Sequence, residues 1–254
     1  MLFLEKGSRS FLHDRQLGCS LAFVAGAVNV AGFLSVGSYC ANMTGNVTAF
    51  AIGLQKGQAE EVVTCIALIA SFFLGAMMCT FLVNGGRRRG QKAIYAYSIL
   101  LEGLLLATID LVQFFWLPPS GHHILPPLGL SFLMGLQNAT VTRISGSVVR
   151  TTHVTGMITD LGIELADWVD AFRHPVDPEH HAKTVLRLRL HSKIIACFIG
   201  GGAVGAFGYT TWPRFFLAGV ACVVIALALP GILANAFPAS SGQTGGDTTP
   251  PSSV

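Results

Sequence analysis

The sequence predicts an all-α, polytopic membrane protein, and three observations support this fold class. Hydrophobic residues make up 52% of the 254 residues and charged residues only 11%, whereas soluble domains carry about 25% charged residues. The apolar residues are grouped into long runs, and a run of about 20 residues is what a spanning helix needs. A pattern of polar and small residues also occurs twice, once in each half of the chain.

Six runs are long and apolar enough to be expected as membrane-spanning helices. The fourth is the most polar, because it contains Gln137, Asn138 and Arg143. The sixth contains Pro230, which a membrane helix tolerates as a kink. The expected spans are residues 17–40, 62–84, 93–117, 124–147, 192–212 and 214–236.

The basic residues determine the expected orientation of these spans. If the N-terminus is cytoplasmic, Lys56 and Arg214 are the only two of the 16 Lys and Arg residues that fall on the outer side. The positive-inside rule therefore predicts a multi-pass protein of the cell inner (plasma) membrane with both termini in the cytoplasm. The Ser-, Thr-, Gly- and Pro-rich tail, residues 239–254, has too few apolar residues to pack and is expected to be disordered.

The repeated pattern relates two units of three spans each. The offset that aligns Gly26 with Gly135 also aligns Asn29 with Asn138. After a short insertion, Thr44-Gly45 aligns with Thr155-Gly156. Because three is odd, the second unit enters the membrane in the opposite sense, as in transporters built from inverted repeats. The expected organisation is a cytoplasmic N-terminus (1–16), a first unit (17–117) and a second unit (118–238) with a cytoplasmic loop at 150–191.

In each unit the Gly-Ser and Thr-Gly segments are expected to break the chain within, or just after, the first helix. Gly relaxes the backbone there, and Thr caps the helix that follows. The helix after the second break should be amphipathic, either lying at the inner surface of the membrane or packed beneath the bundle. Its expected apolar face is Ile158, Leu161, Leu165, Trp168 and Phe172. Its acidic residues, Asp160, Glu164, Asp167 and Asp170, are expected to lie away from that face. Pro175 and Pro178 favour an irregular segment over 173–191.

The stretch GAVNVAGFLSVGSYCANMTGN, residues 26–46, carries a family resemblance. Here the chain resembles the YoaK family of bacterial inner-membrane proteins (domain of unknown function 1275), over roughly residues 15–235. The resemblance implies similar spans and a Thr/Ser-Gly-Asn motif, which Thr44, Gly45 and Asn46 match. The chain departs from the family at Asn29, where members commonly carry Asp, and at Met157 in the second copy. The family's biochemical role is not established, so the resemblance implies no activity.

The residues around the two breaks are candidates for binding a solute. At the first break, Asn42, Thr44, Gly45 and Asn46 could offer backbone amides and side-chain groups to the polar end of a solute. They could equally serve as a helix cap. At the second break the corresponding residues are Thr155 and Gly156. Asn29 and Asn138, one in each unit, could bind a polar solute or hydrogen-bond between helices.

Charged residues inside the spans offer further candidates. Glu102 lies within the third span, where a carboxylate is expensive, and it is a candidate for proton or cation coupling. Asp110 lies on the same span, either deep or near the headgroups. Arg143 could meet an anionic solute or anchor the fourth span at the inner surface.

No catalytic motif occurs in the chain, and no domain outside the membrane is large enough for an enzyme, so an enzyme is not expected. We expect a secondary transporter or facilitator of a small polar or anionic solute, working by alternating access. The alternative is a non-transporting scaffold or accessory subunit that holds a partner through loop 150–191. The expected partners are the lipid bilayer and an unknown solute, without nucleic acid, cofactor or metal, and a homo-oligomer is left open.

Overall fold

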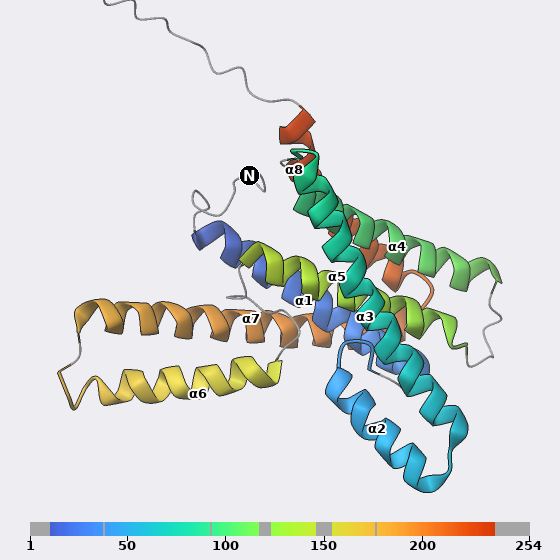
Figure 1. Cartoon of the computed structure of the whole chain (residues 1–254), viewed down its shortest axis with the longest axis horizontal. Helices are drawn as coiled ribbons and strands as arrows, with labels where there is room; N and C mark the ends of the chain where they lie inside the picture. The colour runs from blue at the N-terminus through green and yellow to red at the C-terminus, as the bar shows by residue number, and fades with distance from the viewer. Residues whose placement is uncertain are drawn as a thin grey trace, which may run out of the picture.

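The computed structural model describes residues 11–37, 39–91, 93–116, 123–145, 154–175 and 177–236. Within these ranges every regular element is a helix, which confirms the predicted all-α class (Figure 1). The first half contains α1 (Phe11–Val36), α2 (Met43–Lys56), α3 (Ala59–Arg88) and α4 (Ile94–Trp116). The second half contains α5 (Leu125–Ser145), α6 (Val154–Asp170), α7 (Pro178–Thr211) and α8 (Phe216–Ala236). Most of the predicted N-terminal segment 1–16, the Gly146-Ser147 step and the tail 239–254 lie outside the described residues.

Among the described residues, five helices are long and apolar enough to cross a membrane, where the sequence predicted six spans. These five are α1, α3, α4, α7 and α8. The difference is α5, which forms at the predicted place but is too polar to be counted. Its polar side chains contact other helices: Ser131 Oγ donates to the Leu68 carbonyl at 2.9 Å, and Gln137 Nε2 donates to the Leu21 carbonyl at 3.5 Å. A helix enclosed by protein needs no apolar surface toward lipid.

The principal packing contacts join helices from opposite halves of the chain. α1 packs most extensively on α7, α3 on α5, and α4 on α8. α3 and α5 run in the same direction, because Leu68 contacts Ser131 and Cys79 contacts Thr140 about three turns further along both helices. α1 and α7 also run in parallel (Figure 1). Neither half is therefore a separate bundle.

Two close helix crossings use the same four-residue pattern, Phe-x-x-Gly. At the α1–α7 crossing, a Cβ added to Gly26 would collide with the carbonyl oxygen of Phe198, and one added to Gly201 would collide with that of Phe23. Phe23 and Gly26 form one copy of the pattern, and Phe198 and Gly201 form the other. Only glycine lets the two backbones approach this closely.

The α3–α5 crossing has the same construction. A Cβ on Gly75 would collide with the carbonyl oxygen of Phe132, and a Cβ on Gly135 with that of Phe72. Phe72-x-x-Gly75 and Phe132-x-x-Gly135 are thus two further copies of the pattern. The sequence comparison had aligned Gly26 with Gly135, and these two glycines occupy corresponding places at the two crossings.

The two shorter helices each pack beside the start of the next long helix, α2 on α3 and α6 on α7. The prediction for α6 is partly wrong. Glu164 lies toward α7, where its Oε2 is 3.0 Å from Nδ1 of His191 and both residues are buried. Ile158, Leu165 and Phe172 of the predicted apolar face are exposed, as expected of a helix that lies at the membrane surface.

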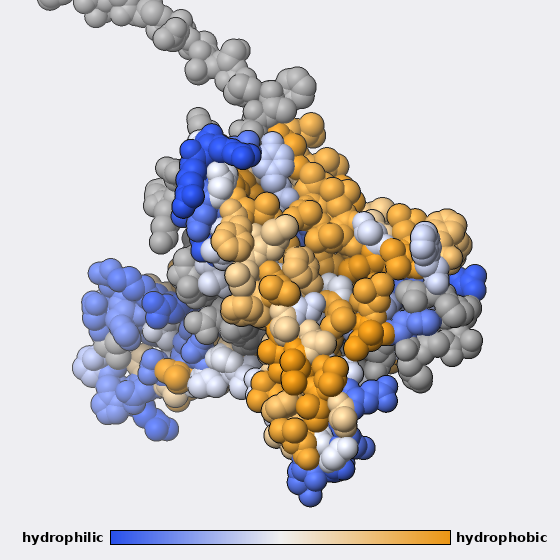
Figure 2. Space-filling view, turned by 45° about the vertical axis from the view of Figure 1, so that its right-hand side comes forward, coloured by the Kyte–Doolittle hydropathy of each residue, from blue (hydrophilic) through white to orange (hydrophobic). Residues whose placement is uncertain are grey.

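The prediction of an irregular segment over 173–191 is also wrong, because α7 begins at Pro178. Asp177 is its N-cap and accepts a hydrogen bond from the Glu179 amide at 3.4 Å. Proline is favoured in the first turn of a helix, since its missing N–H would have no partner there. The projecting hairpin of α6 and the start of α7 is largely hydrophilic, whereas that of α2 and the start of α3 is mostly hydrophobic (Figure 2).

Candidate solute-binding cavity

The break after the first helix is held in place by two asparagine side chains. Gly37 ends α1 with a positive φ of 72°, which favours glycine. Asn29 Oδ1 then accepts a hydrogen bond from the Ala41 amide at 3.1 Å, which ties the connection back to α1. Asn42 caps α2 by accepting from the Gly45 amide, also at 3.1 Å. Asn29 and Asn42 therefore both shape the break.

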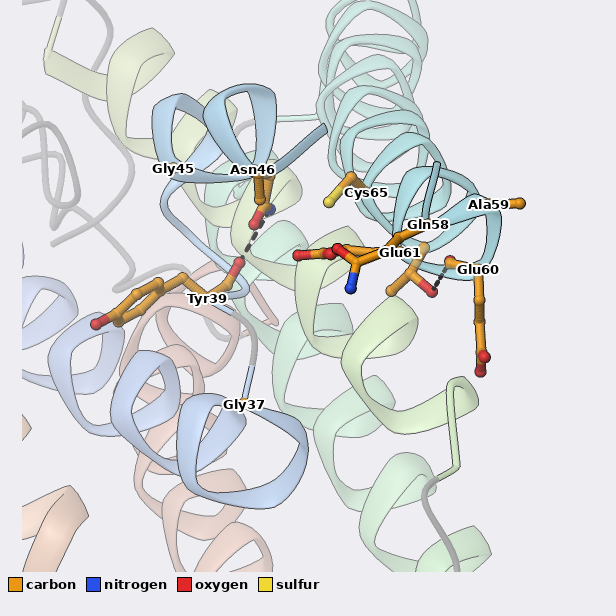
Figure 3. A pocket seen from close by; sticks show the side chains of 11 residues that line it. Gly37, Tyr39, Gly45, Asn46, Gln58, Ala59, Glu60, Glu61 and Cys65 are labelled. Carbon is orange, nitrogen blue, oxygen red and sulfur yellow. Dashed lines mark hydrogen bonds between the residues drawn. The ribbon is translucent and has the colours of Figure 1, made fainter. Parts of the chain in front are cut away.

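A cavity of about 650 Å³ lies beside this break, between the end of α1, α2 and the start of α3. Figure 3 shows the side chains that line it. Its walls include Tyr39, Asn46, Gln58, Glu60, Glu61, Thr64 and Cys65, together with Gly37 and Gly45. The cavity is large enough for a small organic solute.

The charged side chains that line this cavity are two carboxylates, Glu60 and Glu61. Asn46 is buried and its Nδ2 donates to the Tyr39 carbonyl at 3.1 Å, which fixes the amide at the cavity wall. The carboxylate of Glu61 extends toward Asn46 and Tyr39, whereas Glu60 points elsewhere (Figure 3). The side chain of Gln58 makes no capping hydrogen bond to α3, although Gln58 is the N-cap residue. The lining contains two carboxylates and no Lys or Arg, which favours a neutral or cationic solute over an anion.

The structure brings only some of the predicted binding residues to this cavity. Gly45 and Asn46 line it, whereas Thr44 lies exposed on the first turn of α2. In the second half, Thr155 and Gly156 are exposed on the first turn of α6. Asn138 is buried within α5, away from the cavity lining.

Glu102 belongs to a second polar group, in the middle of the helix bundle. It is 2% exposed and hydrogen-bonds to Gln137 of α5, whose Nε2 also reaches the Leu21 carbonyl of α1. Glu102 Oε2 and Gln137 Oε1 are buried without a hydrogen-bond partner among the described residues. Buried polar atoms without partners are unusual in proteins and often accompany function.

Two further charged candidates have structural partners. Asp110 accepts a hydrogen bond from the Ala218 amide in the first turn of α8, and so acts as an N-terminal cap for that helix. Arg143 Nη1 donates to Asn84 Oδ1 at 3.3 Å, at the end of α5. Neither lies at the cavity.

Sequence reasoning missed Glu61 and Gln58, which lie just outside the predicted second span. The available signal was a pair of carboxylates, Glu60 and Glu61, immediately before an apolar run. It also missed the pairing of Glu164 with His191, because the two residues are 27 positions apart on different helices.

The apolar helices and the comparisons together define the class: the chain is an integral, multi-pass helical membrane protein. It belongs to the family described as "protein of unknown function (DUF1275)", whose model matches residues 17–230. This confirms the resemblance drawn from residues 26–46.

Two relatives carry names that agree with this class. The chain is 26% identical over 144 residues to UPF0700 transmembrane protein YoaK of Bacillus subtilis, a match covering 56% of this chain and 62% of YoaK. It is 30% identical over 162 residues to UPF0700 transmembrane protein RA0705 of Rhizobium meliloti, covering 62% and 64%. The match thus spans less than two thirds of either relative. No solved structure matches the chain.

Proposed function

We propose that the protein is a secondary transporter or facilitator, built from two inverted units, that moves a small polar solute by alternating access. The observation that carries this proposal is the repeated Phe-x-x-Gly crossing. The first long helix of each unit packs on the second long helix of the other unit: α1 packs on α7, and α5 packs on α3. Interlocked, repeated helices of this kind are typical of transporters built from inverted repeats.

The cavity beside α2 supports a solute site in the first unit. It lies where the chain breaks after α1, and broken helices commonly line the solute path in such proteins. Because the Glu61 carboxylate extends into it, a neutral or cationic solute fits better than the anionic solute that the sequence also allowed. Glu102 is the coupling group, since a carboxylate enclosed by spanning helices is suited to bind and release a proton or cation.

Transport is tested on the purified protein in proteoliposomes. Radiolabelled uptake is measured for a panel of neutral and cationic amino acids, polyamines and monosaccharides. For any transported probe, Glu61→Gln and Asn46→Ala should lower uptake at least about tenfold. Glu60→Gln, which removes the same charge one residue away, is the matched control and should transport nearly normally. Uptake no higher than in empty liposomes for the whole panel would refute the proposal, as would normal uptake by Glu61→Gln.

Inversion of the two units, and with it the proposed cytoplasmic termini, is tested by labelling. Thr44 and Thr155 occupy matching places on α2 and α6, and both are exposed. In a cysteine-free background, Thr44→Cys should react with an impermeant maleimide from outside the cell and Thr155→Cys only from the cytoplasmic side. Labelling of both from one side would rule out inverted units.

A second function is favoured by the hairpin of α6 and α7. This hairpin projects from the bundle and is largely hydrophilic (Figure 2), as expected of a segment that holds a soluble partner. If the protein is a scaffold or accessory subunit instead, exchanging this hairpin for a short Gly/Ser linker should abolish its role. The same exchange should spare uptake through the α2 cavity if the protein is a transporter.

A further inference from the structure

A group of basic and hydroxyl side chains lies where α3 and α5 end and α4 begins. Arg87 Nη2 donates to Tyr95 Oη at 2.9 Å, and Tyr95 Oη donates to the carbonyl oxygen of Arg143 at 3.4 Å. Arg143 Nη1 in turn donates to Asn84 Oδ1 at 3.3 Å. We call Asn84, Arg87, Tyr95 and Arg143 the basic cluster, since these hydrogen bonds join two arginine residues on three helices.

The turn between α3 and α4 explains why these side chains meet. Gly90 has a φ of 67°, a conformation that favours glycine. A Cβ on Gly86 would meet the end of the Ile94 side chain, so the end of α3 lies close against the start of α4. This tight turn brings Arg87 beside Tyr95.

The positive charge of the basic cluster is not balanced by a carboxylate among the described residues. The ion pairs among the described residues involve neither arginine of the cluster. They join His174 to Asp170, Lys183 to Glu179, and His191 to Glu164. Each guanidinium has five N–H donors, and Arg87 and Arg143 each use one within the cluster. Both residues lie at the C-terminal ends of their helices, where the helix dipole favours a cation and keeps it in place. The remaining donors are available to an anion.

An exposed apolar surface leads directly to the basic cluster along α3. Leu74, Met78 and Phe81 are 54%, 43% and 64% exposed, and they fall on one face of the helix at the usual spacing. Asn84 of the basic cluster follows Phe81 by three residues, so the two lie side by side on the helix surface. A soluble anion has no use for such a surface, whereas a lipid would lay its acyl chains along it.

We propose that the basic cluster binds the phosphate of an anionic phospholipid whose acyl chains lie along the exposed face of α3. The guanidinium fork matches phosphate oxygens in two-point hydrogen bonds, and the Tyr95 hydroxyl holds Arg87 in position. An anionic headgroup is preferred because the choline or ethanolamine cation of a zwitterionic lipid would meet the same positive charges. Pockets of basic residues between spanning helices are a known form of anionic-lipid site. The proposal is independent of any transport activity.

The test counts lipids retained by the full-length protein. Protein is purified from nanodiscs of equimolar phosphatidylglycerol and phosphatidylcholine, and the lipids bound to the folded fraction are counted by native mass spectrometry. The wild type should retain phosphatidylglycerol in preference to phosphatidylcholine. Arg87→Gln and Arg143→Gln should each weaken that retention at least about tenfold. Tyr95→Phe keeps both charges but releases Arg87, and should weaken it several-fold.

Arg189→Gln is the matched control, because Arg189 is exposed on α7 and lies outside the cluster; it should leave retention unchanged. Equal retention by the wild type and Arg143→Gln would overturn the proposal. So would an equal loss in Arg189→Gln, which would indicate diffuse attraction by basic residues in general. Displacement of phosphatidylglycerol by an equal concentration of inorganic phosphate would assign the cluster to a soluble anion and overturn the lipid site.

Discussion

Gly200 and Gly201 are neighbours on α7, yet a side chain added at the two positions meets different surroundings. At Gly201 a Cβ would collide with the carbonyl oxygen of Phe23, a backbone atom that cannot rotate away. At Gly200 the nearest atom is Cε2 of Phe23 at 3.9 Å, an ordinary contact. Both positions lie inside one long helix, so alanine raises helix propensity by about 1 kcal/mol at each. That gain cancels when the two variants are compared, and only the steric difference remains.

We expect Gly201→Ala to be less stable than Gly200→Ala by about 1–3 kcal/mol, the usual penalty for overpacking. For a chain of this length the difference corresponds to roughly 2–12 °C in Tm. The assay is thermal unfolding of both variants in the same detergent, followed by circular dichroism. Gly135→Ala, at the α3–α5 crossing, should resemble Gly201→Ala. If Gly201→Ala melts at or above Gly200→Ala, the close approach of α1 and α7 is wrong, and the interlocked pairing loses its main support.

Two further changes test contacts that hold the short helices. Asn29→Ala removes the acceptor of the Ala41 amide and should lower the free energy of unfolding by about 1–3 kcal/mol. Asn29→Asp keeps an acceptor and should stay near the wild type. Equal Tm values for the wild type and both variants would contradict this role of Asn29. Glu164→Ala leaves His191 without its 3.0 Å partner and should lower stability by about 1–3 kcal/mol and speed proteolysis between α6 and α7. The exposed Asp167→Ala on the same helix is the control, and cleavage at equal rates would count against the buried pair.

Much of the fold follows from the sequence because lipid imposes simple rules on it. Long apolar runs predicted α1, α3, α4 and α8 near their observed places, and the Thr-Gly segments predicted the starts of α2 and α6. The span expected at 124–147 became α5, whose polarity made it the weakest candidate. In the structure that polarity is explained by enclosure, since Gln137 and Ser131 bond to α1 and α3 instead of facing lipid.

What the sequence did not predict depends on partners that are distant in the chain. Glu164 was placed with the other acidic residues of α6, because helical periodicity cannot reveal that His191 lies opposite it. Pro178 was interpreted as a breaker, although at the first turn of a helix proline is stabilising. The Phe-x-x-Gly copies escaped notice because Phe and Gly are common in apolar helices, and only the collisions around Gly26 and Gly135 distinguish them.

The reciprocal pairing also restricts how such a molecule can move. The closest backbone contacts join α1 to α7 and α3 to α5, so rocking one half of the sequence against the other would have to open both glycine crossings. The two pairs meet each other through α1 and α5, where the Gln137 bond to the Leu21 carbonyl is long at 3.5 Å. Separating α1 from α5 would therefore break few polar contacts. The contact between these two helices also lies next to Glu102, which hydrogen-bonds to Gln137. The moving bodies of an alternating-access cycle are therefore expected to be the swapped pairs, with α2 carried by α3 and α6 by α7, rather than the two sequence repeats.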